Sequence, residues 1–207
     1  MPENLHKLFV ISSPSGGGKT SLINKVFEDS RSANFEKSIS DTSRQKRQGD
    51  LEGKDYYFLS EKDFKEKIKK EEYVEYATVF GNFYGTSKNE IKTKYNNSNL
   101  VLELDWQGAY AVKKLFDDAK LIFLVPPSLD DLKQRLIKRN LDSSESIENR
   151  LSEAKKEISK SEMYDYLVLN DDFDKAFEDL SQILFEGISP IDFNSRTSKD
   201  LIKRLVE

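Results

Sequence analysis

The sequence predicts an α/β protein in which a parallel sheet is flanked by helices. Four continuous apolar runs are typical of strands buried on both faces, namely residues 8–11, 100–102, 121–125 and 166–169. Stretches with helical spacing lie between or after these runs. Strands that alternate with helices fold into parallel sheets with crossover connections, and we expect that architecture here.

A glycine-rich turn follows the first apolar run and leads into the first helical pattern. Residues Ser13 to Thr20 read SPSGGGKT, which nearly matches the phosphate-loop pattern G-x-x-x-x-G-K-[ST]. Glycines allow successive backbone N–H groups to surround phosphate oxygens, and the helix N-terminus adds a favourable dipole. Lys19 can reach the β- and γ-phosphates, and the Thr20 hydroxyl can coordinate Mg²⁺ directly.

The sequence departs from this pattern at Ser13, which stands where the first glycine is expected. A serine costs free energy at that position only if the backbone needs a positive φ. The alternative is a glycine-rich surface turn with a chance lysine, but the strand and helix on either side favour a phosphate loop. We therefore expect a P-loop NTPase fold whose nucleoside triphosphate site comprises Ser13, Pro14, Ser15, Gly16, Gly17, Gly18, Lys19, Thr20 and Ser21.

Composition excludes several classes of function. Hydrophobic residues make up 37% of the 207-residue chain and charged residues 34%, as in globular proteins. The absence of cysteine excludes disulfides and thiolate chemistry, and the single histidine, His6, argues against a histidine zinc site or a Ser-His-Asp triad. A net charge of −4 and no long apolar segment favour a cytoplasmic protein without nucleic-acid or membrane partners.

We expect a single domain over residues 1–207, with a core, an insertion, a lid and a tail. The insertion, residues 37–88, is rich in Arg, Lys, Tyr and Gly, and the lid, residues 130–159, carries two helical stripes. The tail, residues 188–207, either packs on the core or mediates self-association, because Leu201, Ile202 and Leu205 share a helical spacing. The core is predicted over residues 1–36, 89–129 and 160–187.

The segment that distinguishes this chain is TSRQKRQGDLEGKDYYFL, residues 42–59. It resembles the signature of the guanylate kinase family and meets each specified position of T-[ST]-R-x₂-[KR]-x₂-[DE]-x₂-G-x₂-Y-x-[FY]-[LIVMK]. The similarity continues to about residue 185 through residues 74–77, 81–86, 105–108, 126–128 and 170–172. The resemblance implies a bacterial-type enzyme that transfers the γ-phosphoryl group of ATP to GMP, and also to dGMP, in purine nucleotide metabolism.

The resemblance also assigns residues to the GMP site. It implies that the GMP phosphate is held by Arg44, Arg47, Tyr56 and Tyr84, and the guanine by Ser40, Glu75 and Thr86. Guanidinium forks match phosphate oxygens, and guanine offers two neighbouring donors that suit the two oxygens of Glu75. Adenine lacks the donor at N1, so a buried carboxylate would be left unpaired. Asp105 is placed near the ribose and Asn170 in the ATP site.

For catalysis, the resemblance implies Lys19, Arg44 and three lid arginines, Arg135, Arg139 and Arg150. Positioned cations stabilise the charge that spreads over the transferring group, and an anionic phosphate acceptor requires no general base. Mg²⁺ is the implied cofactor. Thr20 would bind it directly, and Glu103, where the family usually has Asp, and Asp105 would bind it through water.

Two other functions stay open at this point. A kinase-like scaffold module would keep the fold but bind phosphorylated protein segments, although Lys19, Thr20 and the lid arginines argue against it. A kinase for dTMP or AMP is disfavoured by the complete signature together with Ser40, Glu75 and Thr86. Without the flanking Tyr and Gly pattern, Arg44 and Arg47 would read as a solvated basic stretch. The sequence leaves the oligomeric state undetermined.

Overall fold

The computed structural model describes residues 6–79, 81–138, 144–189, 191 and 195–206. The chain divides into two compact units. Unit 1 comprises residues 1–10 and 34–119, and unit 2 comprises residues 11–33 and 120–207. The boundary therefore falls within the first strand and again just before Lys120.

The main sheet has the strand order β2-β7-β1-β8-β9, and four of its strands are the predicted apolar runs. Pairing is parallel between β2 and β7 and between β8 and β9. Every residue of β1 is buried, which explains why the run shows no polar alternation. The strands are β1 (Leu8–Ser12), β2 (Phe35–Lys37), β7 (Asn99–Glu103), β8 (Lys120–Val125) and β9 (Tyr166–Leu169).

Unit 1 carries a second sheet with the strand order β4-β3-β6-β5. β6 pairs antiparallel with both β3 and β5, whereas β3 and β4 are parallel. The strands are β3 (Asp41–Thr42), β4 (Tyr57–Phe58), β5 (Tyr73–Val79) and β6 (Asn82–Ser87). The helices of this unit are α2 (Glu61–Lys69), α3 (Lys88–Tyr95) and α4 (Trp106–Leu115).

The second sheet and α2 share an aromatic core around Phe64. This side chain is fully buried, and its ring stacks on Tyr73 and Phe83 with centroid distances of 4.6 and 5.4 Å. The helix begins at a side-chain cap, because the Ser60 hydroxyl accepts a hydrogen bond from the backbone N–H of Asp63. Phe64 is thus the side chain through which α2 holds β5 and β6.

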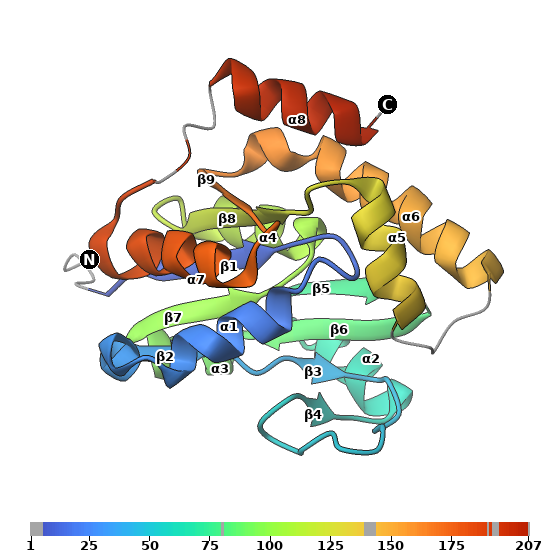
Figure 1. Cartoon of the computed structure of the whole chain (residues 1–207). Coiled ribbons are helices and arrows are strands. Elements are labelled where there is room, and N and C mark those ends of the chain that lie inside the picture. Colours follow the sequence, from blue (N-terminus) through green and yellow to red (C-terminus); the bar gives the residue numbers. More distant parts are fainter. Residues whose placement is uncertain (1–5, 80, 139–143, 190, 192–194, 207) are drawn as a thin grey trace. The chain divides into compact units, whose positions relative to one another are not determined.

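Unit 2 is mainly helical, and its helices pack in pairs. α1 lies against α7, α5 against α6, and α8 against α6 (Figure 1). Helix α8 of the tail thus packs on α6, with Leu205 only 3% exposed. The elements are α1 (Lys19–Glu28), α5 (Leu129–Lys138), α6 (Ser144–Ser159), α7 (Phe173–Ser181), α8 (Arg196–Val206), the 3₁₀ segments η1 (Ser30–Asn34) and η2 (Ser161–Met163), and a π-helical turn, η3 (Gln182–Glu186).

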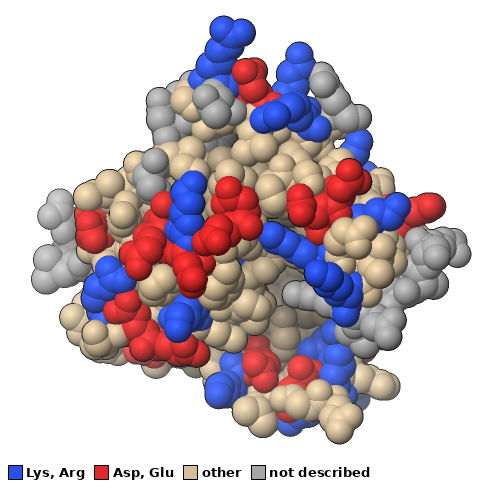
Figure 2. Space-filling model, viewed as in Figure 1, with Lys and Arg blue, Asp and Glu red and all other residues tan. Residues whose placement is uncertain are grey.

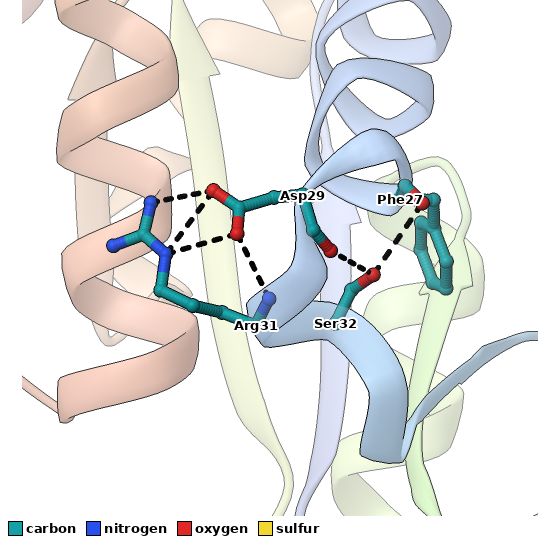
Figure 3. A network of polar contacts seen from close by, with 4 residues as sticks. All are labelled: Phe27, Asp29, Arg31 and Ser32. Atoms are coloured by element: carbon teal, nitrogen blue, oxygen red, sulfur yellow. Dashed lines mark hydrogen bonds and ion pairs between the residues drawn. The ribbon is translucent and has the colours of Figure 1, made fainter.

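A local polar network ends α1 (Figure 3). The Asp29 carboxylate accepts hydrogen bonds from the backbone N–H of Arg31 at 2.9 Å and from its guanidinium at 2.7 Å. The Ser32 hydroxyl donates to the Asp29 carbonyl at 2.7 Å, and the guanidinium lies 4.9 Å above the ring of Phe185 in η3. Arg31 lowers the pKa of Asp29, so this carboxylate stays ionised and keeps the chain turned after the helix.

The surface carries charges of both signs. Figure 2 shows acidic and basic side chains interspersed over the face in view, in keeping with a formal net charge of only −4. Among the described residues, no helix combines the length and the apolar character needed to cross a membrane.

Replacing Phe64 with alanine is expected to lower the free energy of unfolding by about 3–5 kcal/mol, because the cavity would lie between two stacked rings. Denaturant titration followed by circular dichroism measures this loss. Tyr76→Ala is the matched control, since this aromatic residue of β5 is 52% exposed and should cost less than about 1 kcal/mol. Equal losses in the two variants would contradict the assigned core.

Candidate functional site

The phosphate loop of unit 2 leaves the first turn of α1 without a side-chain cap. α1 begins after Gly18, which has a φ of 87° and makes no side-chain cap hydrogen bond. In contrast, α2, α3, α4 and α7 each begin with a Ser or Asp whose side chain accepts a backbone N–H. The N–H groups and dipole at the start of α1 are thus available to an anion.

Ser13 fits the loop without backbone strain. Glu71 is the only non-glycine residue with positive φ in the described part of the chain, so Ser13 does not adopt the left-handed region. Its side chain is buried, and its hydroxyl donates to the carbonyl of Pro14 at 3.2 Å. The Gly17 N–H also donates to that carbonyl, at 2.8 Å. The missing first glycine of the pattern therefore carries no conformational cost here.

Asn170, which follows β9, supports the backbone of the phosphate loop through a hydrogen bond. Its side chain is 4% exposed, and its Nδ2 donates to the carbonyl of Gly17 at 2.7 Å. A Cβ at position 18 would lie 2.6 Å from this Nδ2, so the close approach requires glycine there. The structure thus places Asn170, predicted in the ATP site, against the loop backbone.

Within unit 2, one of the predicted lid arginines contacts the phosphate loop and another contacts Asn170, which supports the loop. Arg135 of α5 donates from Nη2 to the backbone carbonyl of Asn170 at 2.8 Å. Arg150 of α6 lies with Nη1 3.5 Å from the hydroxyl of Ser15. Arg139 lies outside the described residues. Lys19, Thr20 and Ser21 form the first turn of α1, with Thr20 and Ser21 exposed.

The residues predicted to bind guanine lie together in unit 1. Strand pairing sets Glu75 of β5 directly opposite Thr86 of β6, next to a bulge between Tyr73 and Glu75. The hydroxyls of Ser40 and Thr86 are 3.4 Å apart. Glu75 and Thr86 are 6% and 0% exposed, whereas Ser40 is half-buried.

Burial dominates the electrostatics of Glu75. Loss of solvent raises the pKa of its carboxyl to about 7, hydrogen bonds from Thr86 act in the opposite direction, and the charge of Asp105 raises the pKa further. Its Oε1 is buried and has no hydrogen-bond partner among the described residues. A buried acceptor without a donor is costly, so Glu75 is suited to receive donors from a ligand.

The predicted phosphate-binding residues form a second cluster in unit 1. Arg44 pairs with Asp50 at 2.9 Å, and its guanidinium lies 5.4 Å from the ring centroid of Tyr56. The rings of Tyr56 and Tyr84 meet edge to face at 5.7 Å. Burial raises the pKa of Tyr56 to about 12, which keeps its hydroxyl a neutral donor. Arg47 is exposed, and its backbone N–H donates to Asp50 at 2.8 Å.

The two acids at the end of β7 and just after it are engaged within unit 1. Glu103 pairs with Lys37 at 3.0 Å. Asp105 caps α4, because its Oδ1 accepts from the backbone N–H of Gly108 at 2.9 Å and its Oδ2 from the Gln107 amide at 3.2 Å. Sequence reasoning missed Lys37 and Asp50 as partners, because charge pairs set by tertiary structure leave no periodic signal.

Comparison with known proteins gives one consistent family. Residues 5–187 match the family model described as guanylate kinase. A guanylate kinase of Wolbachia sp. subsp. Brugia malayi (strain TRS) is 45% identical over 184 residues, which cover 88% of this chain and 93% of the relative. One of Hahella chejuensis is 47% identical over 178 residues, covering 86% and 85%. The crystal structure of guanylate kinase from Anaplasma phagocytophilum superposes with a TM-score of 0.73 at 31% identity, covering 99% and 98% of the two chains.

Removing the Asn170 side chain is expected to destabilise unit 2. Asn170→Ala leaves the Gly17 carbonyl without its buried donor, at a cost of about 1–3 kcal/mol. Thermal unfolding followed by circular dichroism measures the effect. Asn97→Ala is the matched control, because Asn97 also donates to a backbone carbonyl but does so at the exposed surface. If the control lowers the unfolding temperature as much as Asn170→Ala does, the special role of Asn170 is wrong.

Proposed function

Because this chain belongs to the guanylate kinase family, we propose that it transfers the γ-phosphoryl group of ATP to GMP. Members of this family are nucleoside monophosphate kinases. In the proposed reaction a phosphate oxygen of GMP attacks the γ-phosphorus, the bond to the β,γ-bridging oxygen breaks, and ADP and GDP form. The observation that carries the substrate assignment is the buried Glu75 carboxylate with an unpartnered Oε1. The same proposal places the enzyme in the cytoplasm and in purine nucleotide metabolism.

Guanine selection follows from the donors and acceptors of the Glu75 cluster. Guanine N1–H and its 2-amino group would donate to the carboxylate, and the Ser40 or Thr86 hydroxyl would donate to O6. Adenine offers no N1 donor and would leave the buried carboxylate unsatisfied, a penalty of several kcal/mol by order of magnitude. dGMP carries the same base, so the proposal includes it as a substrate.

The GMP phosphate is proposed to bind at Arg44, Tyr56 and Tyr84. A phosphate carries more charge than a carboxylate and accepts the guanidinium fork bidentately, so it can displace Asp50 from Arg44. The tyrosine hydroxyls would add neutral donors. Arg47 would join them by turning its exposed side chain toward the phosphate.

The phosphate loop of unit 2 is proposed to hold ATP. Its backbone N–H groups and Lys19 would bind the β- and γ-phosphates, while Arg135 and Arg150 would neutralise charge on the group in transfer. Both arginines already contact the loop or its support. The acceptor oxygen is anionic, so no residue is assigned as a general base.

The donor set fits a magnesium ion carried largely by the nucleotide. Among the described residues no group of three His, Cys, Asp or Glu side chains gathers as a metal cage. Magnesium usually keeps several waters and binds through substrate phosphates and few protein groups, and Thr20 offers an exposed hydroxyl at the start of α1. Glu103 and Asp105 would act through water. When bound, the ion would withdraw charge from the β- and γ-phosphates.

The experiment that tests this function measures ADP formation from Mg·ATP with GMP, dGMP, AMP, dTMP and UMP supplied separately. We expect turnover with GMP and dGMP only. Lys19→Ala should lower kcat by at least about a hundredfold, because it removes the cation at the β- and γ-phosphates. Turnover with AMP or dTMP instead would reassign the substrate. Folded protein without any turnover would favour a module that binds phosphorylated ligands.

GMP binding is expected to depend on pH through Glu75. The carboxylate must be ionised to accept two donors. Because burial raises the pKa of Glu75 to about 7, the carboxyl becomes protonated as the pH falls below 7, and GMP binding should weaken. Calorimetric titration from about pH 6 to about pH 8 should show affinity rising toward a plateau. The phosphate of GMP titrates near pH 6 as well, and Glu75→Gln retains that contribution alone. Identical pH profiles for the wild type and this variant would remove Glu75 from guanine recognition.

A further inference from the structure

A glycine in the first turn of α4 lies directly against the Glu75 carboxylate. A Cβ built on Gly108 would lie 2.9 Å from Oε2 of Glu75 and 3.2 Å from its Cδ. It would also lie 3.1 Å from the Cβ of Leu104. Contacts this short oblige one of the neighbours to move.

The backbone at Gly108 gives no other reason for glycine. Its φ lies outside the left-handed region, and it lies in the first turn of a regular helix, α4. Alanine is favoured over glycine within helices, by up to about 1 kcal/mol in a helix interior. The close approach of the Glu75 carboxylate to position 108 therefore explains why glycine stands there despite its cost to the helix.

The helix cannot easily move away from the carboxylate. The Gly108 N–H donates to Oδ1 of Asp105 at 2.9 Å, and the Ala109 N–H donates to the Asp105 carbonyl at 2.9 Å. Leu104, whose Cβ the added methyl group would approach to 3.1 Å, is 7% exposed and held in the core. That contact requires a shift of a few tenths of an ångström whichever acid stands at position 75, whereas the shorter contact is relieved by displacing the flexible end of Glu75.

We propose that Gly108 is a positioning residue for guanine selection, because its bare Cα sets where the Glu75 carboxylate lies. Oε2 rests on Gly108, and Thr86 lies across the strand pair, which leaves Oε1 without a partner among the described residues. A carboxylate shifted by a few tenths of an ångström would no longer meet two guanine donors at good distances. This inference rests on the proposed function, since it concerns how GMP is selected.

The test compares Gly108→Ala with the wild type in steady-state kinetics. We expect KM for GMP to rise by at least about tenfold while KM for ATP stays unchanged, because only the guanine contact is displaced. The unfolding temperature should change little, because the preference of the helix for alanine opposes the tight contact with Leu104. Ala111→Gly is the matched control. It weakens the same helix without a methyl group near Glu75, and it should leave KM for GMP unchanged.

Rescue by a shorter acid separates positioning from a general disturbance. Glu75→Asp withdraws the carboxylate from position 108 and keeps its charge, so Gly108→Ala should change KM for GMP less than about twofold in that background. If Gly108→Ala alone fails to fold, the double variant should fold and behave as Glu75→Asp does.

Three results would overturn the inference. They are an unchanged KM for GMP in folded Gly108→Ala, the same fold-change in both backgrounds, and loss of folding in the single and double variants alike. Absence of GMP turnover in the wild type, run in the same assay, would instead overturn the proposed function on which the inference rests.

Discussion

Burial of the main-sheet strands on both faces confines polar chemistry to the ends of those strands. β1 is buried along its whole length, and β8 is buried at every residue except its first. A strand with no solvent-exposed face can present polar side chains only at its ends. In parallel sheets, ligands bind beyond the carboxyl ends of the strands. In unit 2 the phosphate loop follows β1 and Asn170 follows β9. In unit 1 the two acids at positions 103 and 105 end β7 or follow it.

Unit 1 contains two buried acids that differ in their hydrogen-bond partners. Asp41 is 4% exposed and fully engaged, with Lys67 and with the hydroxyl of Tyr73 at 2.8 Å. Burial and the bond to Asp41 raise the pKa of Tyr73 well above its usual range. Glu75 is equally buried but lacks a partner at Oε1. Asp41 stabilises the fold, whereas Oε1 of Glu75 remains an acceptor to which a ligand can donate a hydrogen bond.

Much of the main sheet could be predicted, because strands buried on both faces appear in the sequence as continuous apolar runs. β2 was not predicted, since it has three residues that are all half-buried and carries Glu36 and Lys37. The phosphate loop could be identified from local pattern alone. Glu75, in contrast, was found only through resemblance, because a single acid in a short strand resembles any surface carboxylate. The contact of Asn170 with Gly17 joins residues 153 positions apart, and no local pattern encodes it.

The position of the single tryptophan has a practical consequence for spectroscopy. Trp106 is the first residue of α4; it follows Asp105, which caps the helix, and shares the first turn with Gly108. The rest of the chain has no indole, so tryptophan emission originates from unit 1 alone. The emission offers an optical signal from the start of α4 that needs no dye, and the phosphate loop of unit 2 contributes no competing fluorophore.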